Sequence, residues 1–94
     1  MTISKENKVF LEGLIEYYIS EAQSYREMAQ EYSLKIDSVS DTAFGIIVGC
    51  IYSSFLQTYS NQKLTPTVQD IQEFTEIIMM KSSAIMDAIN GQNN

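Results

Sequence analysis

The stretch from Ala43 to Leu56 constrains the fold most, because its side chains are apolar in every direction once it is wound into a helix. Ten consecutive residues, 43–52, carry no charged or strongly polar group. A helix that is apolar all round has to be buried on more than one side. The stretch therefore predicts a core helix that the rest of the chain must cover.

Two other structures compete for this stretch. The β-branched residues Ile46, Ile47 and Val48 favour a strand, but the run continues for about twenty residues without a turn signal, which is too long for one. A membrane span is the second alternative. Fourteen helical residues cover roughly 21 Å, less than the ~30 Å hydrocarbon core, and Asp41 and Gln57 flank them closely. We therefore predict a helix without membrane contact.

Three small residues, Gly45, Gly49 and Ser53, recur at intervals of four and share one side of this helix. Each glycine costs about 0.5–1 kcal/mol relative to alanine in a helix interior, so the space it leaves should be used. A second helix, from the same chain or from a second copy, would approach closely there. Alternatively, the glycines admit a bulky Tyr or Phe of the same chain, and the sequence leaves both interpretations open.

The whole chain, residues 1–94, predicts one all-α domain in which three helices run up, down and up. The central helix should be the most buried, and the surplus of apolar faces predicts association into a homodimer. The predicted helices cover about 4–36, 38–60 and 66–90, and the tail 91–94 is expected to be disordered. The expected caps are Ser4 or Thr2, Asp37 or Ser38, and Thr65 followed by Pro66, with Gly91 at the last helix end.

The first predicted helix carries two interleaved seven-residue series, which together indicate a heptad seam. One series is bulky and the other is mostly small, so facing layers can interdigitate. The series are Leu11, Tyr18, Tyr25, Tyr32 and Ile15, Ala22, Ala29, Ile36. The third helix has a wide apolar side with flexible methionines, which suits an adaptable contact surface. Its members Met79 and Met80, together with Tyr18, Tyr25 and Tyr32, join Gly45 and Gly49 as interface candidates.

Composition agrees with an interaction protein. With 45% hydrophobic and 19% charged residues, the chain is apolar for a small monomer, and part of that surplus should lie in a subunit interface. The net charge is −6 and the six basic residues are scattered, which argues against nucleic-acid binding. A basic protein partner remains an alternative. Because no signal-peptide core follows the N-terminus, we expect a cytoplasmic protein.

The sequence offers few residues of the types that usually carry catalysis. Histidine is absent, and the single cysteine, Cys50, sits in the apolar run, where a cysteine usually acts as a small hydrophobe. Acidic pairs at helical spacing raise the possibility of a metal site, but the central helix would add only Asp41. These pairs are Glu12 with Glu16, Glu27 with Glu31, and Glu73 with Glu76.

We therefore predict a non-enzymatic helical interaction or oligomerisation module, a scaffold or regulatory adaptor, without catalytic, cofactor or metal residues. The alternative is a domain that binds a small ligand or a divalent metal in an interhelical pocket rimmed by Tyr and Glu.

Overall fold

The computed structural model describes residues 2–91, and within them it contains four helices and no strand. The all-helical class is confirmed, whereas the predicted count of three helices is wrong. The elements are α1 (Lys5–Ser20), α2 (Ala22–Gln30), α3 (Val39–Asn61) and α4 (Val68–Ile89).

The extra helix arises because the predicted first helix breaks at Glu21, between α1 and α2. The Ser20 hydroxyl donates to the carbonyl of Tyr17 at 2.6 Å, and the Ser24 hydroxyl donates to the carbonyl of Glu21 at 2.7 Å. Such side-chain bonds compete with the helical ladder and bend helices. The heptad pattern runs through the break because it records which side is buried, not whether the helix is continuous.

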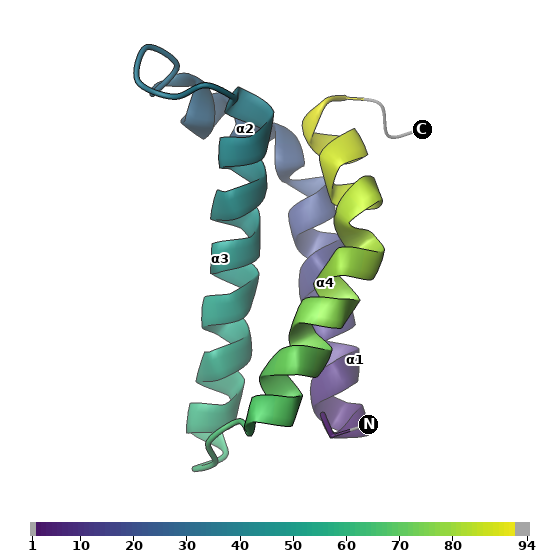
Figure 1. Cartoon of the computed structure of the whole chain (residues 1–94). Coiled ribbons are helices and arrows are strands. Elements are labelled where there is room, and N and C mark those ends of the chain that lie inside the picture. The colour runs from purple at the N-terminus through teal and green to yellow at the C-terminus, as the bar shows by residue number, and fades with distance from the viewer. Residues whose placement is uncertain (1, 92–94) are drawn as a thin grey trace.

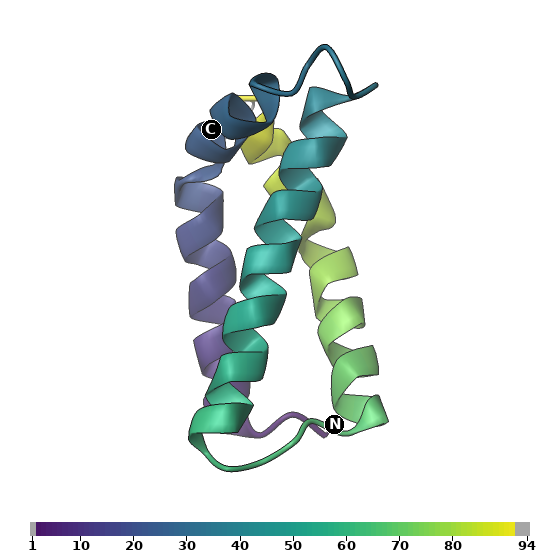
Figure 2. The same cartoon turned by 90° about the vertical axis from the view of Figure 1, so that its left-hand side faces the viewer.

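The four helices form three arms. In Figure 1, α1 and α2 rise as one bent arm, α3 descends and α4 rises again to the C-terminal end. Figure 2 shows the same arms from the side of α3, which lies nearest the viewer with no other helix in front of it. The molecule is elongated, with extents of 41 × 29 × 19 Å. One long side of α3 therefore faces outward.

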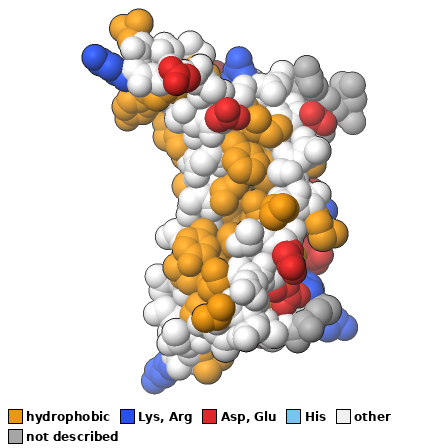
Figure 3. All heavy atoms as spheres, in the orientation of Figure 1, with side chains coloured by type: hydrophobic (Ala, Val, Ile, Leu, Met, Phe, Trp, Pro, Cys, Tyr) orange, Lys and Arg blue, Asp and Glu red, His pale blue; other side chains and the backbone are white. Residues whose placement is uncertain are grey.

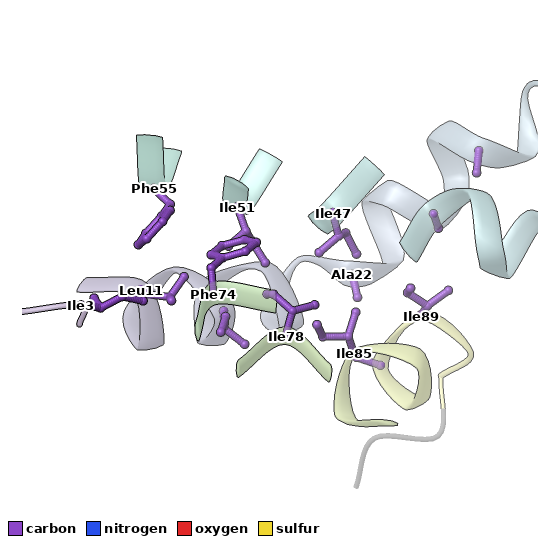
Figure 4. Close-up of a cluster of buried hydrophobic side chains, with 14 of the residues drawn as sticks. Ile3, Leu11, Ala22, Ile47, Ile51, Phe55, Phe74, Ile78, Ile85 and Ile89 are labelled. Atoms are coloured by element: carbon purple, nitrogen blue, oxygen red, sulfur yellow. The ribbon is translucent and has the colours of Figure 1, made fainter. Parts of the chain in front are cut away.

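The core lies between the three arms, where apolar side chains from all four helices meet (Figure 4). Aromatic rings pack at one end of it, with the centroids of Phe55 and Phe74 4.9 Å apart. Fully burying a side chain of this size contributes about 1.5–3 kcal/mol. The buried apolar residues of the helices are Leu11, Ile15, Ala22, Ala29, Ala43, Ile47, Ile51, Phe55, Tyr59, Phe74, Ile78, Ile85, Ala88 and Ile89.

Burial of α3 is one-sided. Its five buried residues recur every four positions from Ala43 to Tyr59, whereas Gly45, Gly49 and Ser53 are exposed. The prediction that the central helix is the most buried is not confirmed, since α3 and α4 each bury five apolar residues and α4 also buries Asp70. A three-arm bundle gives each arm only two neighbours, so an arm that is apolar all round keeps an open side.

Two helix starts agree with their predicted caps. The Ser4 hydroxyl accepts a hydrogen bond from the Asn7 N–H, and the Ser38 hydroxyl accepts one from the Asp41 N–H, both at 3.1 Å. Each bond satisfies a backbone donor that has no partner inside the helix. The predicted starts of the first and second arms are therefore confirmed to within a residue or two.

The start of α4 differs from its prediction. Thr67 is the cap instead of Thr65, and it forms a reciprocal capping box with Asp70. Two donors are satisfied at once in such a box, which outweighs the favourable position of Pro66. At the other end of α4, Gly91 adopts a positive φ of 72°, as expected after a helix terminus. Of the tail predicted to be disordered, residues 92–94 lie outside the described part of the chain.

Candidate functional site

The predicted interface residues do not form one surface. Tyr18 and Tyr25 lie where α1 meets α2, and Tyr32 lies in the turn after α2. Gly45 and Gly49 lie on the exposed side of α3. The structure thus separates the tyrosines of the heptad seam from the glycine stripe. The methionines Met79 and Met80 are both on α4, but on different sides of it.

The tyrosines near the helix break act as packing residues. The rings of Tyr18 and Tyr25 are 5.5 Å apart, and both side chains are half-buried against the core. Burial, with the nearby Cys50 thiol as a smaller contribution, raises the pKa of Tyr18. Tyr32 is instead 59% exposed because the helix has ended before it. Tyr18 and Tyr25 therefore help to close α1 and α2 onto the core, whereas Tyr32 does not.

The two glycines of α3 face open space. A Cβ atom added to Gly45 or Gly49 would meet no atom within 4 Å outside the local helix backbone. Neither a second backbone nor an aromatic ring of the same chain uses the space that these glycines leave. The same-chain interpretation of the stripe is therefore wrong. The interpretation that a second copy approaches the stripe stays a prediction.

We define the outer face of α3 as this exposed stripe together with the apolar side chains beside it, on the side toward α4. The apolar neighbours are half-buried or partly exposed, so an approaching surface can reach them. Figure 3 shows hydrophobic side chains gathered in a long column down this side of the molecule. The outer face consists of Gly45, Val48, Gly49, Tyr52, Ser53 and Leu56.

Helix α4 extends this face through one of the predicted methionines. Met79 is 68% exposed. It lies one turn before Ser82 and two turns before Met86, and both of these residues line a cavity together with Phe44 of α3. Met80 turns instead toward α1, where it borders a hollow beside Lys8. Met79 therefore lies on the side of α4 that borders this cavity, and Met80 does not.

The two ends of the outer face carry opposite charge. At the N-terminal end of α3, a shallow cavity of about 350 Å³ opens between α3 and α4. Its lining combines two carboxylates, two hydroxyls and an apolar floor: Asp41, Asp87, Ser82, Ser83, Phe44 and Met86. At the C-terminal end of α3, Lys63 stands exposed in the turn toward α4, with a φ of 61°. The outer face thus has the carboxylates of Asp41 and Asp87 at one end, where Arg26 of α2 also donates to Ser40 and Asn90, and Lys63 at the other.

The acidic pair Glu73 and Glu76 is divided by its contacts, because only Glu73 is held by the N-terminal segment. One Glu73 oxygen accepts the N–H groups of Thr2 and Ile3, both at 2.9 Å, and the other lies 2.7 Å from Lys8 Nζ. These backbone hydrogen bonds and the Lys8 ammonium lower the pKa of Glu73 to about 2. Glu76 remains exposed outside this network.

Glu73 would be the best ligand in the alternative of a metal pocket rimmed by glutamates, but its carboxylate already binds Thr2, Ile3 and Lys8. Within residues 2–91, no group of three or more Asp, Glu, Cys or His side chains is placed to hold a metal ion. The contact between Lys8 and Glu73 could not be predicted from the sequence, because the spacing of two residues so far apart in the chain does not indicate that they meet.

Helix α3 is the one described helix that is long and apolar enough to cross a membrane. Its 23 residues span about 34 Å, whereas the apolar stretch alone suggested a shorter element. Only 22% of its most apolar part is buried within the chain. This low burial of α3 agrees with the exposure of its outer face.

Comparison with known proteins adds no assignment. No protein-family model matches the sequence, and neither the curated proteins nor the solved structures give a match.

Proposed function

We propose that this chain is a non-enzymatic self-association module that forms a homodimer through the outer face of α3 and serves as a scaffold or regulatory adaptor. The observation that carries the proposal is the pair of exposed glycines, Gly45 and Gly49, inside an otherwise apolar helix. Glycine weakens a helix interior, and nothing in the chain uses the space that these two provide. A second copy would use it.

The extent of the surface supports the proposal. The chain exposes 6138 Å², roughly 600 Å² more than the about 5500 Å² expected of a compact monomer of its mass. Its radius of gyration, 14.1 Å, likewise exceeds the about 12 Å expected for its length. One partner in a standard interface buries about 800 Å². The excess is therefore of the size that a dimer would cover.

Helix geometry explains why glycine suits such an interface. Two packed helices lie about 8–10 Å apart, and small residues at the crossing allow the shorter distance. Close approach over Gly45 and Gly49 would bring the flanking side chains Val48, Tyr52 and Leu56 against the second copy. Burial of these apolar groups would drive the association.

The test is the solution mass, measured by light scattering over a concentration series. The wild-type chain is expected to reach twice the chain mass, and Gly49→Leu is expected to shift the series to monomer while helix content is retained. Gly13→Leu is the matched control, because Gly13 is also exposed in a helix with no atom near its missing Cβ. That variant should dimerise like the wild type. A wild-type monomer at every concentration would exclude the proposal.

A further inference from the structure

We infer that the homodimer is antiparallel, with Lys63 of each copy seated in the cavity that holds Asp41 and Asp87 of the other. This inference rests on the proposed function and specifies its geometry. It follows from the charges at the two ends of the outer face, from the spacing of its small and large residues, and from the apolar side chains exposed beyond each end.

Charge separates the two possible orientations. In a parallel pair, the Asp41 carboxylate of one copy would face Asp41 of the other, with Asp87 and the exposed Asp37 close to the same end. Of the cations at this end, Arg26 donates to Ser40 and Asn90, and Lys35 lies in the turn before α3. Like charges placed opposite each other are destabilising. An antiparallel pair places Lys63 against these carboxylates twice, once at each end. It also sets the N-terminus of one α3 beside the C-terminus of the other, the favourable arrangement of helix dipoles.

The cavity suits a lysine side chain. Its volume is about 350 Å³, with the carboxylates of Asp41 and Asp87 among its lining and Phe44 and Met86 providing apolar surface. A lysine covers apolar surface with its methylene stem and keeps its ammonium among polar groups. Lys63 stands on the connection beyond α3, where it can reach past the end of its own helix.

The register that follows is consistent along the helix. If Asp41 faces Lys63 of the second copy, the two-fold axis passes beside residue 52, halfway between them. Val48 then faces Leu56 of the second copy, because this pair is centred on the same residue as Asp41 and Lys63, and Tyr52 lies beside its own symmetry mate. Ser53, which is exposed, lies next to its own symmetry mate.

Apolar residues exposed at opposite ends of the molecule would meet in the same arrangement. Leu34 is 96% exposed in the turn between α2 and α3, and Tyr32 is exposed beside it. Leu64 is exposed in the turn between α3 and α4, at the other end of the molecule. In an antiparallel dimer, the turn between α2 and α3 of one copy would lie over the turn between α3 and α4 of the other. This arrangement would shield these side chains from water.

Cysteine cross-linking tests the orientation in a Cys50→Ser background, with the mass measured first by light scattering. Ser53→Cys is expected to form an intermolecular disulfide in most of the dimer. Asp41→Cys alone should give almost none, whereas an equal mixture of Asp41→Cys and Lys63→Cys chains should cross-link. Efficient self-cross-linking of Asp41→Cys would overturn the antiparallel arrangement.

The same experiment separates the two proposals. A dimer by mass in which neither Ser53→Cys nor the mixture cross-links would overturn the antiparallel register and leave self-association standing on another face. A monomer by mass would overturn the proposed function itself, and the inference with it.

Charge reversal gives a second readout that needs no new cysteine. Lys63→Glu or Asp41→Lys alone is expected to raise the dimer dissociation constant by about tenfold, since two exposed pairs become repulsive. The double variant Asp41→Lys with Lys63→Glu restores both pairs only if the copies are antiparallel, so its dissociation constant should return close to the wild-type value. A double variant weaker than either single variant would overturn the inference.

Discussion

The two sides of α3 are similar in composition and opposite in environment. On one side, Ala43, Ile47, Ile51, Phe55 and Tyr59 pack against the other arms and are almost completely buried. On the other, the outer face carries exposed glycines and apolar residues that the described part of the chain covers only in part. Hydrophobicity thus reports how much surface a helix can bury, and not which molecule buries it.

The largest expected effect compares neighbouring isoleucines. Ile47 is completely buried and Ile46 is only partly buried, so truncation to alanine leaves a cavity at one position and not at the other. Ile47→Ala should lower the free energy of unfolding by about 2–5 kcal/mol, and Ile46→Ala by clearly less. Chemical denaturation at low protein concentration measures both. Equal losses would mean that Ile46 is covered as completely as Ile47 in the single chain.

A smaller effect is expected where the N-terminus of the chain is fastened to α4. Glu73→Ala removes the acceptor for Thr2 and Ile3 and the partner of Lys8, so the free energy of unfolding should fall by about 1–3 kcal/mol. Glu76→Ala, three residues later and exposed, is the control and should change it little. A matching loss in both variants would contradict the assigned network.

The same network predicts a dependence on pH. The folded pKa of Glu73, about 2, lies below its ordinary value of 4.5, so the charged form is favoured by folding. Its stabilisation is complete above about pH 5 and is lost as the pH falls from about 4.5 toward 2. Asp70, whose pKa is also lowered, adds to the loss in the same direction. Unfolding measured from pH 6 to pH 2 should show a shallower decline in Glu73→Ala.

The smallest effect concerns the outer face itself. Because a Cβ meets nothing at Gly45 or Gly49, alanine at each should raise the stability of the dilute monomer by about 0.5–1 kcal/mol. Thermal unfolding at low concentration measures this gain, and Gly13→Ala should show a similar one. A loss of stability at Gly45 or Gly49 alone would mean that a backbone already packs there.

Much of the fold could be predicted from local signals. Ser4 and Ser38 cap their helices as expected, and the buried series Leu11, Ile15, Ala22 and Ala29 followed from the heptad spacing. The break at Glu21 could not be predicted, because serine hydroxyls bond either to water or to the backbone. The cap lies at Thr67 and not at the predicted Thr65, because the reciprocal bonds between Thr67 and Asp70 form just after Pro66.

The candidate site was predicted only in part. Gly45 and Gly49 were singled out by their spacing, and the structure places them together with Met79 on one side of the molecule. The cavity at Asp41 and Asp87 joins two helices whose register depends on packing, so spacing within either helix could not reveal it.

By itself, the sequence determined that this chain is all-helical, where two of its arms begin, and that α3 has more apolar surface than a strand or a loop could hold. These properties depend on neighbours a few residues apart, through capping bonds and the period of the helix. Only the tertiary structure decided which side of α3 stays open, because burial depends on how many arms surround a helix. It also decided that Glu73 holds the N-terminal segment, because residues distant in the chain meet only after the arms have packed.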